Sequence, residues 1–443
     1  MIKKVIGYGL ITFCLLFAEA HAAERLDLTN CLRRAYRNNH LLKASEWQVA
    51  AAQEQLKAAE AQRWPEISFN SQYTRIGKVS SFSFATAPDA PRRKFTFGTP
   101  NRVNLDLRLQ MPVFTWWRVS SLIDLARVGK EISQLQQEQQ QLNTTDQVLR
   151  AFYAVVLNNQ VVRLLEENIA RTRVYLETTQ RRFEAGQVPR LEVMRAQVQL
   201  SNEENNLETA KGNLEKSKIF LAKTIGSPDE EVDAEGNLEF QQLAVSSEAI
   251  IREALEYRLD LKIIQQQRKL NEHEIALNQS ADKPNLFFFS GYNVTNGFDP
   301  TDPNRFVDNW NVGVQLSWPL FNGFRTRYEV QNARINQKIT DLREAEMREM
   351  LLVQIQQALV NLKQSEIQIQ SQEKNIVLAR EALKMATDQY EQGFISALDL
   401  VEAQKGLLQT ELAHTQAIFN HIMTKIDLGK AVGRYQGFAV DEE

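Results

Sequence analysis

Cysteine is almost absent from this sequence, with Cys14 and Cys31 the only two in 443 residues. Because Cys14 falls in a segment that we expect to be removed, a disulfide scaffold and a cysteine-built metal site are both excluded. The five histidines form no HExxH pattern, and the chain has neither a Walker A loop nor a GxGxxG fingerprint. His414 and His421 are seven residues apart but have no further ligands nearby, so we expect no metal, no cofactor and no catalytic site.

An excess of charge of one sign is also missing, since 52 Lys and Arg face 55 Asp and Glu. This balance gives no support for nucleic acid as a partner. Glycine and proline are too few, at 18 and 11, for a collagen-like or low-complexity chain. The hydrophobic share of 43% is enough for a large core, and long stretches rich in Gln, Glu, Ala and Leu predict long helices.

The N-terminus has the pattern of an export signal. Lys3 and Lys4 precede an apolar run over 5–17, and Ala20-His21-Ala22 places small residues where a signal peptidase cleaves. We therefore expect 1–22 to be a signal peptide. No later run of about 20 apolar residues is evident, so the sequence predicts no transmembrane helix in the exported chain.

The rest of the chain is an internal repeat. An offset of 207 residues pairs Pro112 with Pro319, Gly186 with Gly393 and Gly226 with Gly433, whereas an offset of 219 pairs Pro65 with Pro284. The difference is a longer loop in the first half, between Tyr73 and Val103. The sequence thus predicts a first repeat over 23–226, a linker over 227–244, a second repeat over 245–433 and a tail over 434–443.

Each repeat contains two stretches that alternate between apolar and polar residues, and these are expected strands. They span about 65–76 and 102–114 in the first repeat, and about 284–295 and 309–321 in the second. Period two gives each strand one apolar and one polar face. Ten tilted residues cover roughly 25 Å, the height of the apolar band of an outer-membrane barrel. Aromatic residues lie near the strand ends, where an aromatic girdle would sit: Trp116, Trp117, Trp310, Trp318 and Phe321.

Long helices make up most of each repeat. A helix precedes the strands, a proline-free helix follows them over about 116–185 or 324–392, and a return helix runs over about 188–226 or 396–432. Apolar residues at heptad spacing predict a coiled-coil seam. These are Val155, Val162, Ile169, Leu176 and Phe183, and their counterparts Leu362, Ile369, Ile376, Leu383 and Tyr390. Each rod would be about 100 Å long.

Four strands cannot close a barrel, and an open sheet in lipid leaves backbone groups unpaired. Two chains would give eight strands with a filled interior, and three would give twelve with a water-filled lumen. The polar faces, with Arg102, Asp106 and Arg108, favour three. The predicted fold is therefore mixed α/β but mainly α, with two tandem repeats of a coiled-coil helical hairpin plus a β-hairpin. A homotrimer would form a 12-stranded barrel and a 12-helix periplasmic tunnel.

The repeated strand endings, Met111-Pro112-Val113-Phe114 and Trp318-Pro319-Leu320-Phe321, and the helix tips around Gly186 and Gly393 resemble the TolC-like outer membrane factor family of efflux and secretion channels. The resemblance covers nearly the whole exported chain. It implies a homotrimer in the Gram-negative outer membrane that extends into the periplasm. It also implies that the helix tips dock a periplasmic adaptor, which links the channel to an inner-membrane pump of the RND or ABC type. The expected docking residues are Gly186, Arg190, Leu191, Gly393, Ser396 and Leu398.

The resemblance also implies a gate at the periplasmic aperture, formed by acidic rings just after the second tip. The matching positions are Asp399 and Glu402, with Glu192 and Arg195 as their first-repeat counterparts and candidate partners. A basic gate residue that is common in the family is replaced here by Ile395. An alternative interpretation of Asp399 is a helix-start carboxylate that interacts with the helix dipole.

We expect a passive channel whose energy comes from the pump. A soluble periplasmic coiled-coil scaffold, which would need no barrel, is the alternative from another class. An enzyme is disfavoured, because no acid/base, nucleophile or metal cluster stands out.

Overall fold

The computed structural model describes residues 24–438 apart from 86, 88, 90, 97, 300, 301 and 436. The chain divides into two compact units. The bundle unit comprises Met1–His40, Leu142–Ser247 and Gln356–Glu443, and the sheet unit comprises Leu41–Gln141 and Glu248–Ile355. The expected signal peptide, 1–22, and the end of the tail, 439–443, lie outside the described residues.

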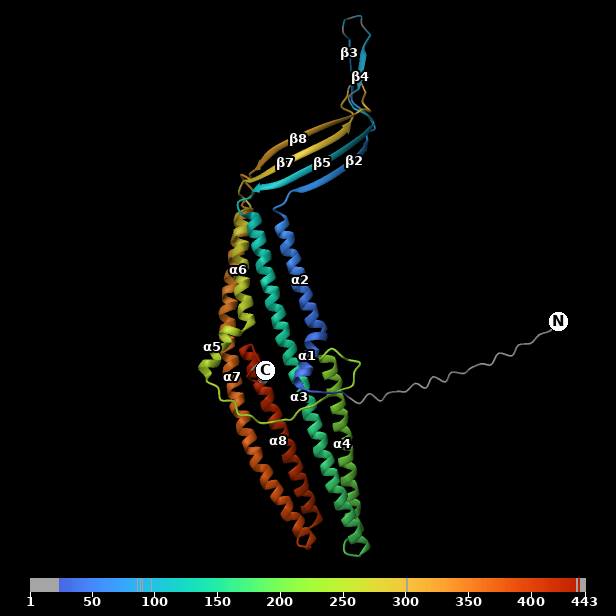
Figure 1. Ribbon diagram of the computed structural model, residues 1–443, viewed down its shortest axis with the longest axis vertical. Helices are drawn as coiled ribbons and strands as arrows, with labels where there is room; N and C mark the ends of the chain where they lie inside the picture. Colours follow the sequence, from blue (N-terminus) through green and yellow to red (C-terminus); the bar gives the residue numbers. More distant parts are fainter. Residues whose placement is uncertain are drawn as a thin grey trace, which may run out of the picture. The chain divides into compact units, whose positions relative to one another are not determined.

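The sheet unit is built on a four-stranded antiparallel sheet. Its strands are β2 (Glu66–Arg75), β5 (Asn101–Phe114), β7 (Asn285–Asn296) and β8 (Phe306–Ser317), in the order β2-β5-β7-β8 (Figure 1). β5 of the first repeat pairs with β7 of the second, so the hairpins of the two repeats form one sheet. The edges of this sheet, β2 and β8, pair with no further strand among the described residues.

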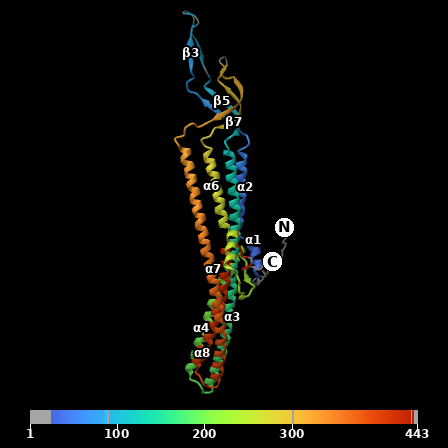
Figure 2. The same ribbon diagram turned by 90° about the vertical axis from the view of Figure 1, so that its left-hand side faces the viewer.

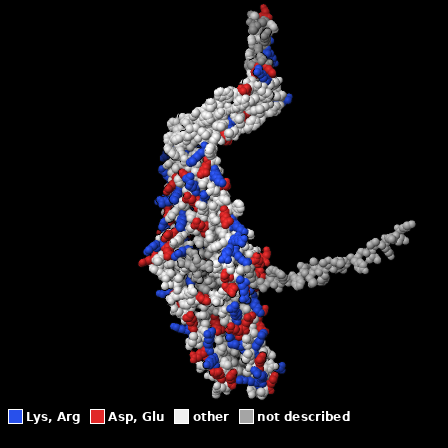
Figure 3. Space-filling model, in the orientation of Figure 1, with Lys and Arg blue, Asp and Glu red and all other residues white. Residues whose placement is uncertain are grey.

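The two faces of the sheet differ in chemistry. Phe69, Leu107 and Tyr292 occupy one register row on the apolar face, where large side chains are exposed, with Leu107 at 46% and Phe69 at 66%. The opposite face carries polar residues such as Asp106 and Arg108, whose charged groups lie 3.7 Å apart. Figure 3 shows few charged residues on the visible surface of the sheet, and many on the helices. An exposed apolar face on a sheet is suited to lipid rather than to water.

Both prolines near the strand ends alter the predicted strands. In β5 the register shifts after Pro112, so that Met111 pairs with Phe288 but Phe114, not Val113, pairs with Leu286. Proline has no N–H for the ladder, and a β-bulge here moves Phe114 onto the apolar face, where simple alternation would have placed Val113. The expected strand over 309–321 was wrong at its end: β8 stops at Ser317, two residues before Pro319.

The longer loop of the first repeat contains a small hairpin that the sequence did not predict, β3 (Ser81–Phe84) with β4 (Arg93–Thr96). The helix expected before each pair of strands is broken in two. In the first repeat α1 (Leu28–Asn38) is followed by α2 (His40–Ala61), and in the second α5 (Ser247–Tyr257) by α6 (Leu259–Gln279).

The long helices are α3 (Arg118–Glu184) and α7 (Arg325–Glu391), and the return helices are α4 (Arg190–Thr224) and α8 (Ala397–Val432). In the bundle unit these four helices run side by side (Figures 1 and 2). The predicted seam is buried there: Val155 and Ile369 are fully inaccessible to solvent. The prediction of a mainly helical chain with two repeats is confirmed.

The linker takes part in the core of the bundle unit. Its strand β6 (Val232–Ala234) pairs in parallel with β1 (Glu24–Leu26), and both pack with the buried Cys31 and Leu221. Gly226, with φ of 81°, lies so close to Asn38 that a Cβ would sit 2.8 Å from its backbone. A region expected only to be a linker is thus part of a packed core.

One helix in the described part of the chain, α3, contains an 18-residue window apolar enough to cross a membrane by length and composition. Of that window 44% is buried within the protein. Core helices meet the same criterion, so the window is weak evidence for a span.

Candidate functional site at the helix tips

Glycine turns end the two long helices in the same way. Gly186 has φ of 73° and Gly393 has φ of 79°, and no atom lies near the position of a Cβ on either. Gln187 N–H donates to Arg182 O at 2.8 Å, and Phe394 N–H to Gln389 O at 2.9 Å. These bonds satisfy carbonyls at the helix ends, and glycine adopts the required left-handed conformation without steric cost.

The second tip starts its return helix with a capping box. Ser396 N–H and Ser396 Oγ both donate to Asp399 Oδ2, at 3.0 and 2.7 Å, and Asp399 N–H donates to Ser396 Oγ at 3.3 Å. The side-chain and backbone hydrogen bonds from Ser396 lower the pKa of Asp399 below its usual value. Both of these hydrogen bonds use Oδ2, the Asp399 side chain is exposed, and Oδ1 has no hydrogen-bond partner among the described residues.

The other expected gate residues form local ion pairs. Glu192 accepts from Arg195 at 3.1 Å, and Glu402 lies 3.8 Å from Lys405. Each pair joins neighbours on one helix face, so these carboxylates carry no bond between hairpins in the described chain.

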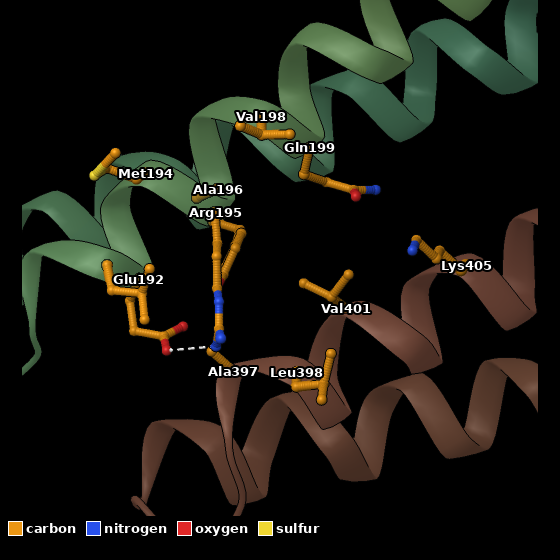
Figure 4. Close-up of a pocket in the computed structure, with 12 residues that line it drawn as sticks. Glu192, Met194, Arg195, Ala196, Val198, Gln199, Ala397, Leu398, Val401 and Lys405 are labelled. Carbon is orange, nitrogen blue, oxygen red and sulfur yellow. Dashed lines mark hydrogen bonds and ion pairs between the residues drawn. The ribbon is translucent and has the colours of Figure 1, made fainter.

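An apolar cavity of about 430 Å³ lies between the starts of α4 and α8 (Figure 4). Leu191, Met194 and Val198 line it from α4, and Leu398 and Val401 from α8. Glu192, Arg195 and Lys405 add charges at its margin (Figure 4). The structure thus brings together Glu192, Arg195, Leu191 and Leu398, whereas Asp399 and Glu402 do not line the cavity. Gly186, Arg190, Gly393 and Ser396 lie in or beside the turns.

A contact between the two tips was missed in the sequence. The Arg182 guanidinium lies 4.5 Å from the centre of the Tyr390 ring, and it donates to Tyr390 O at 3.4 Å and to Glu391 O at 3.4 Å. Tyr175 packs beside Tyr390, with ring centres 6.1 Å apart. The sequence does contain one sign of this contact, since the two repeats differ here: the first tip has Arg182 where the second has Gln389.

An ion pair repeated in both hairpins was also missed. Arg173 on α3 bonds Glu204 on α4 at 3.0 Å, and at the same offset of 207 residues Arg380 on α7 bonds Glu411 on α8 at 3.4 Å. Glu411 is the more buried acid, with its side chain 10% exposed, and Arg171 approaches it at 3.9 Å. The pair joins each outgoing helix to its return helix.

His421 is a core residue. Its ring is fully buried, Nε2 lies 3.2 Å from Gln241 O, and Nδ1 lies 2.9 Å from Ser365 Oγ. Burial lowers its pKa, although the Gln241 carbonyl acts in the other direction. With both nitrogens engaged, His421 is unsuited to metal binding. Within the described part of the chain no group of three His, Cys, Asp or Glu is placed to hold a metal ion.

The model of the family described as outer membrane efflux protein matches residues 31–227 and 250–434, the two repeats. The chain belongs to this family. It is accordingly an outer-membrane protein of the efflux-channel class, which extends into the periplasm.

Individual relatives match this chain at low sequence identity. Nodulation protein T of Rhizobium leguminosarum bv. trifolii is 22% identical over 58% of the chain, and outer membrane protein TolC of Vibrio cholerae is 23% identical over 65%. The chain spans 55% and 66% of these relatives. The crystal structure of the Campylobacter jejuni CmeC outer membrane channel superposes with a TM-score of 0.76 at 17% identity, over 94% of the chain and 87% of CmeC. That likeness extends the shared fold to both units. Of these proteins, CmeC is named as an outer membrane channel and TolC as an outer membrane protein.

Proposed function

We propose that three copies of this chain form one outer-membrane channel, the exit duct of an efflux or type I secretion system. Each copy contributes four strands to a 12-stranded barrel and four helices to a periplasmic tunnel. Transport through it is passive, and the energy comes from an inner-membrane pump to which a periplasmic adaptor connects the helix tips.

The observation that carries this proposal is the four-stranded sheet with two unpaired edges and two unlike faces. Unpaired N–H and C=O groups in lipid cost several kcal/mol each, by an order-of-magnitude estimate. The edges β2 and β8 therefore need partners, and the two other copies supply one each. The apolar face then meets lipid, and the face with Asp106 and Arg108 lines a wet lumen.

At the other end of the channel, the acidic residues after the second tip act as the gate. Asp399 and Glu402 would place six carboxylates at the mouth of a trimer, which attracts cations and repels anions. Glu192 and Arg195 are their counterparts in the first repeat, and in the assembled mouth they would supply partners for these carboxylates. The turns and the exposed Arg190, Leu191 and Leu398 form the docking surface for the adaptor.

Disulfide cross-linking between edge strands tests the trimer. Gln72→Cys on β2 is combined in turn with Asn309→Cys, Asn311→Cys or Gln315→Cys on β8, since the register between copies is to be found. In one chain the two edges are roughly 14 Å apart, three strand spacings, so an intrachain disulfide cannot form. One pairing should yield covalent trimers on denaturing gels, with Gln72→Cys alone as the control. Only monomers at every position would refute the shared barrel.

A further inference from the structure

Two glycines interrupt the polar face of the sheet. Gly291 on β7 pairs with Arg108 on β5 and with Asn311 on β8. Gly313 on β8 pairs with Phe289 on β7. Glycine in the interior of a strand weakens it, and it often marks a place where another group approaches the backbone. Neither glycine has a positive φ, so the backbone conformation does not require glycine at either position.

The neighbouring side chains cover these two glycines to different extents. The Phe289 ring lies over Gly313, where a Cβ would be 2.8 Å from Cζ of the ring. Over Gly291 only the Asn311 amide is close, with Oδ1 at 2.9 Å from the position of a Cβ. A cavity of about 240 Å³ remains beside Gly291. It is lined by Asp106, Arg108, Gln110, Phe289, Asn311 and Gln315. The missing side chain of Gly291 thus leaves room for a ligand between Arg108 and Asn311.

The hydrogen-bond donors around this cavity are unused. The Arg108 side chain is 61% exposed, and the nearest carboxylate, that of Asp106, lies 3.7 Å away, beyond hydrogen-bonding distance. Among the described residues, no side-chain hydrogen bond is made by Arg108 or by the amides of Gln110, Asn311 and Gln315. A guanidinium has five N–H groups in a planar fork that matches a carboxylate. The cavity therefore offers a surplus of donors, which suits an anion.

We propose that the cavity is a binding site for a carboxylate group of the transported cargo, with Arg108 as its charged partner. Arg108 donates to both carboxylate oxygens, and rotation of the Asn311 amide presents Nδ2 to one of them from the other side of Gly291. Asp106 competes with this carboxylate for Arg108, so binding is weak and reversible, as passage through a channel requires. The inference rests on the proposed barrel, because only a closed barrel turns this face towards the lumen, where three copies would provide three such sites.

A cysteine placed in the cavity tests the site. Gln315→Cys gives the protein a single accessible thiol, because Cys31 is buried and Cys14 lies in the expected signal peptide. In the protein purified in detergent, the rates at which this thiol reacts with an anionic and a cationic methanethiosulfonate reagent are compared. Adding Arg108→Gln should lower the ratio of the anionic to the cationic rate about fivefold, as for the loss of one exposed charge contact. Succinate should slow the anionic reagent while Arg108 is present, and butane-1,4-diol, its uncharged analogue, should not.

Two further variants separate a site from the mean charge of the lumen. Arg102→Gln removes a positive charge from the same strand and face, but the Arg102 guanidinium lies 4.9 Å from the centre of the Phe298 ring and does not line the cavity. This variant should leave the rate ratio and the protection by succinate unchanged. Gly291→Ala keeps every charge and fills the gap, so it should weaken the protection. Equal effects of Arg102→Gln and Arg108→Gln, or no protection by succinate, would overturn the proposal.

Failure of the channel itself gives a different result. Only monomers in the cross-linking between β2 and β8 would refute the barrel and with it the role in cargo transport, even where succinate protects the thiol. Covalent trimers without protection by succinate would reject the carboxylate site alone.

Discussion

Arg182 at the end of α3 reaches across to Tyr390 at the end of α7, with its guanidinium over the ring and its N–H groups on the backbone carbonyls of Tyr390 and Glu391. The two helical hairpins of one chain are therefore bonded at their tips by a single side chain. A cation at a helix C-terminus also interacts favourably with the helix dipole.

Arg182→Ala should loosen this link. The cation–π contact alone contributes about 1 kcal/mol, so the tips should separate more often and the conductance in planar bilayers should rise. Arg181→Ala is the matched control, because among the described residues Arg181 makes only a 3.5 Å hydrogen bond to Thr178 on its own helix. Equal conductance of both variants would show that the link does not restrain the tips.

Asp399→Ala combined with Glu402→Ala should raise conductance and reduce cation selectivity, since the acidic ring at the mouth is removed. Ser396→Ala is the control: it removes the cap, at about 1 kcal/mol of helix stability, but keeps both charges. In the wild type the hydrogen bonds from Ser396 lower the pKa of Asp399. The cation selectivity of the wild type should therefore persist to a pH below the usual carboxyl range. Unchanged conductance and selectivity in the double variant would exclude these residues as the gate.

His421 should make the protein less stable in acid. Burial lowers its pKa in the folded state, so below the ordinary histidine pKa of about 6.5 the unfolded chain binds the proton first. Stability is therefore full above that pH and is lost as pH falls towards the folded-state pKa. His421→Leu, which installs the residue found at the counterpart Leu214, should flatten the fall in Tm between pH 7 and pH 5. His40→Gln, on the surface, should leave that fall in Tm unchanged. Identical pH profiles of the wild type and both variants would show that His421 is not the cause of the acid sensitivity.

Two glycines with similar backbone conformations should respond differently to alanine. Gly186→Ala meets open space and incurs only left-handed strain, about 1 kcal/mol. Gly226→Ala incurs that strain and also places its Cβ 2.8 Å from the Asn38 backbone. Chemical denaturation should show a clearly greater loss for Gly226→Ala, and losses of equal size would indicate that α1 shifts without cost.

The features fixed by periodicity could be predicted from the sequence. Apolar residues at heptad spacing, from Val155 to Ile169 and in the second repeat, predicted the long helices. Alternation of apolar and polar residues predicted the four strands. The ends of the strands could not be predicted, because Pro112 is tolerated inside β5 through a bulge whereas β8 stops before Pro319. Residues at equivalent positions of the two repeats can thus have different effects on a strand, because their neighbours differ.

The sequence also did not show which distant segments contact one another. The Arg182–Tyr390 link needs two tips that lie 208 residues apart in the chain to meet. The pairing of β1 with β6 depends on three-residue strands, which are too short for a periodic signal. The capping box at Ser396 and Asp399 is local, but for Asp399 the sequence analysis considered only a gate carboxylate or an interaction with the helix dipole.

That short parallel pair has a consequence for biogenesis. In the described part of the chain Glu24–Leu26 pairs only with Val232–Ala234, so this pair cannot form until about 200 further residues of the polypeptide have been made. The core around Cys31 and Leu221, to which both strands belong, is therefore completed late in synthesis, after both segments are present.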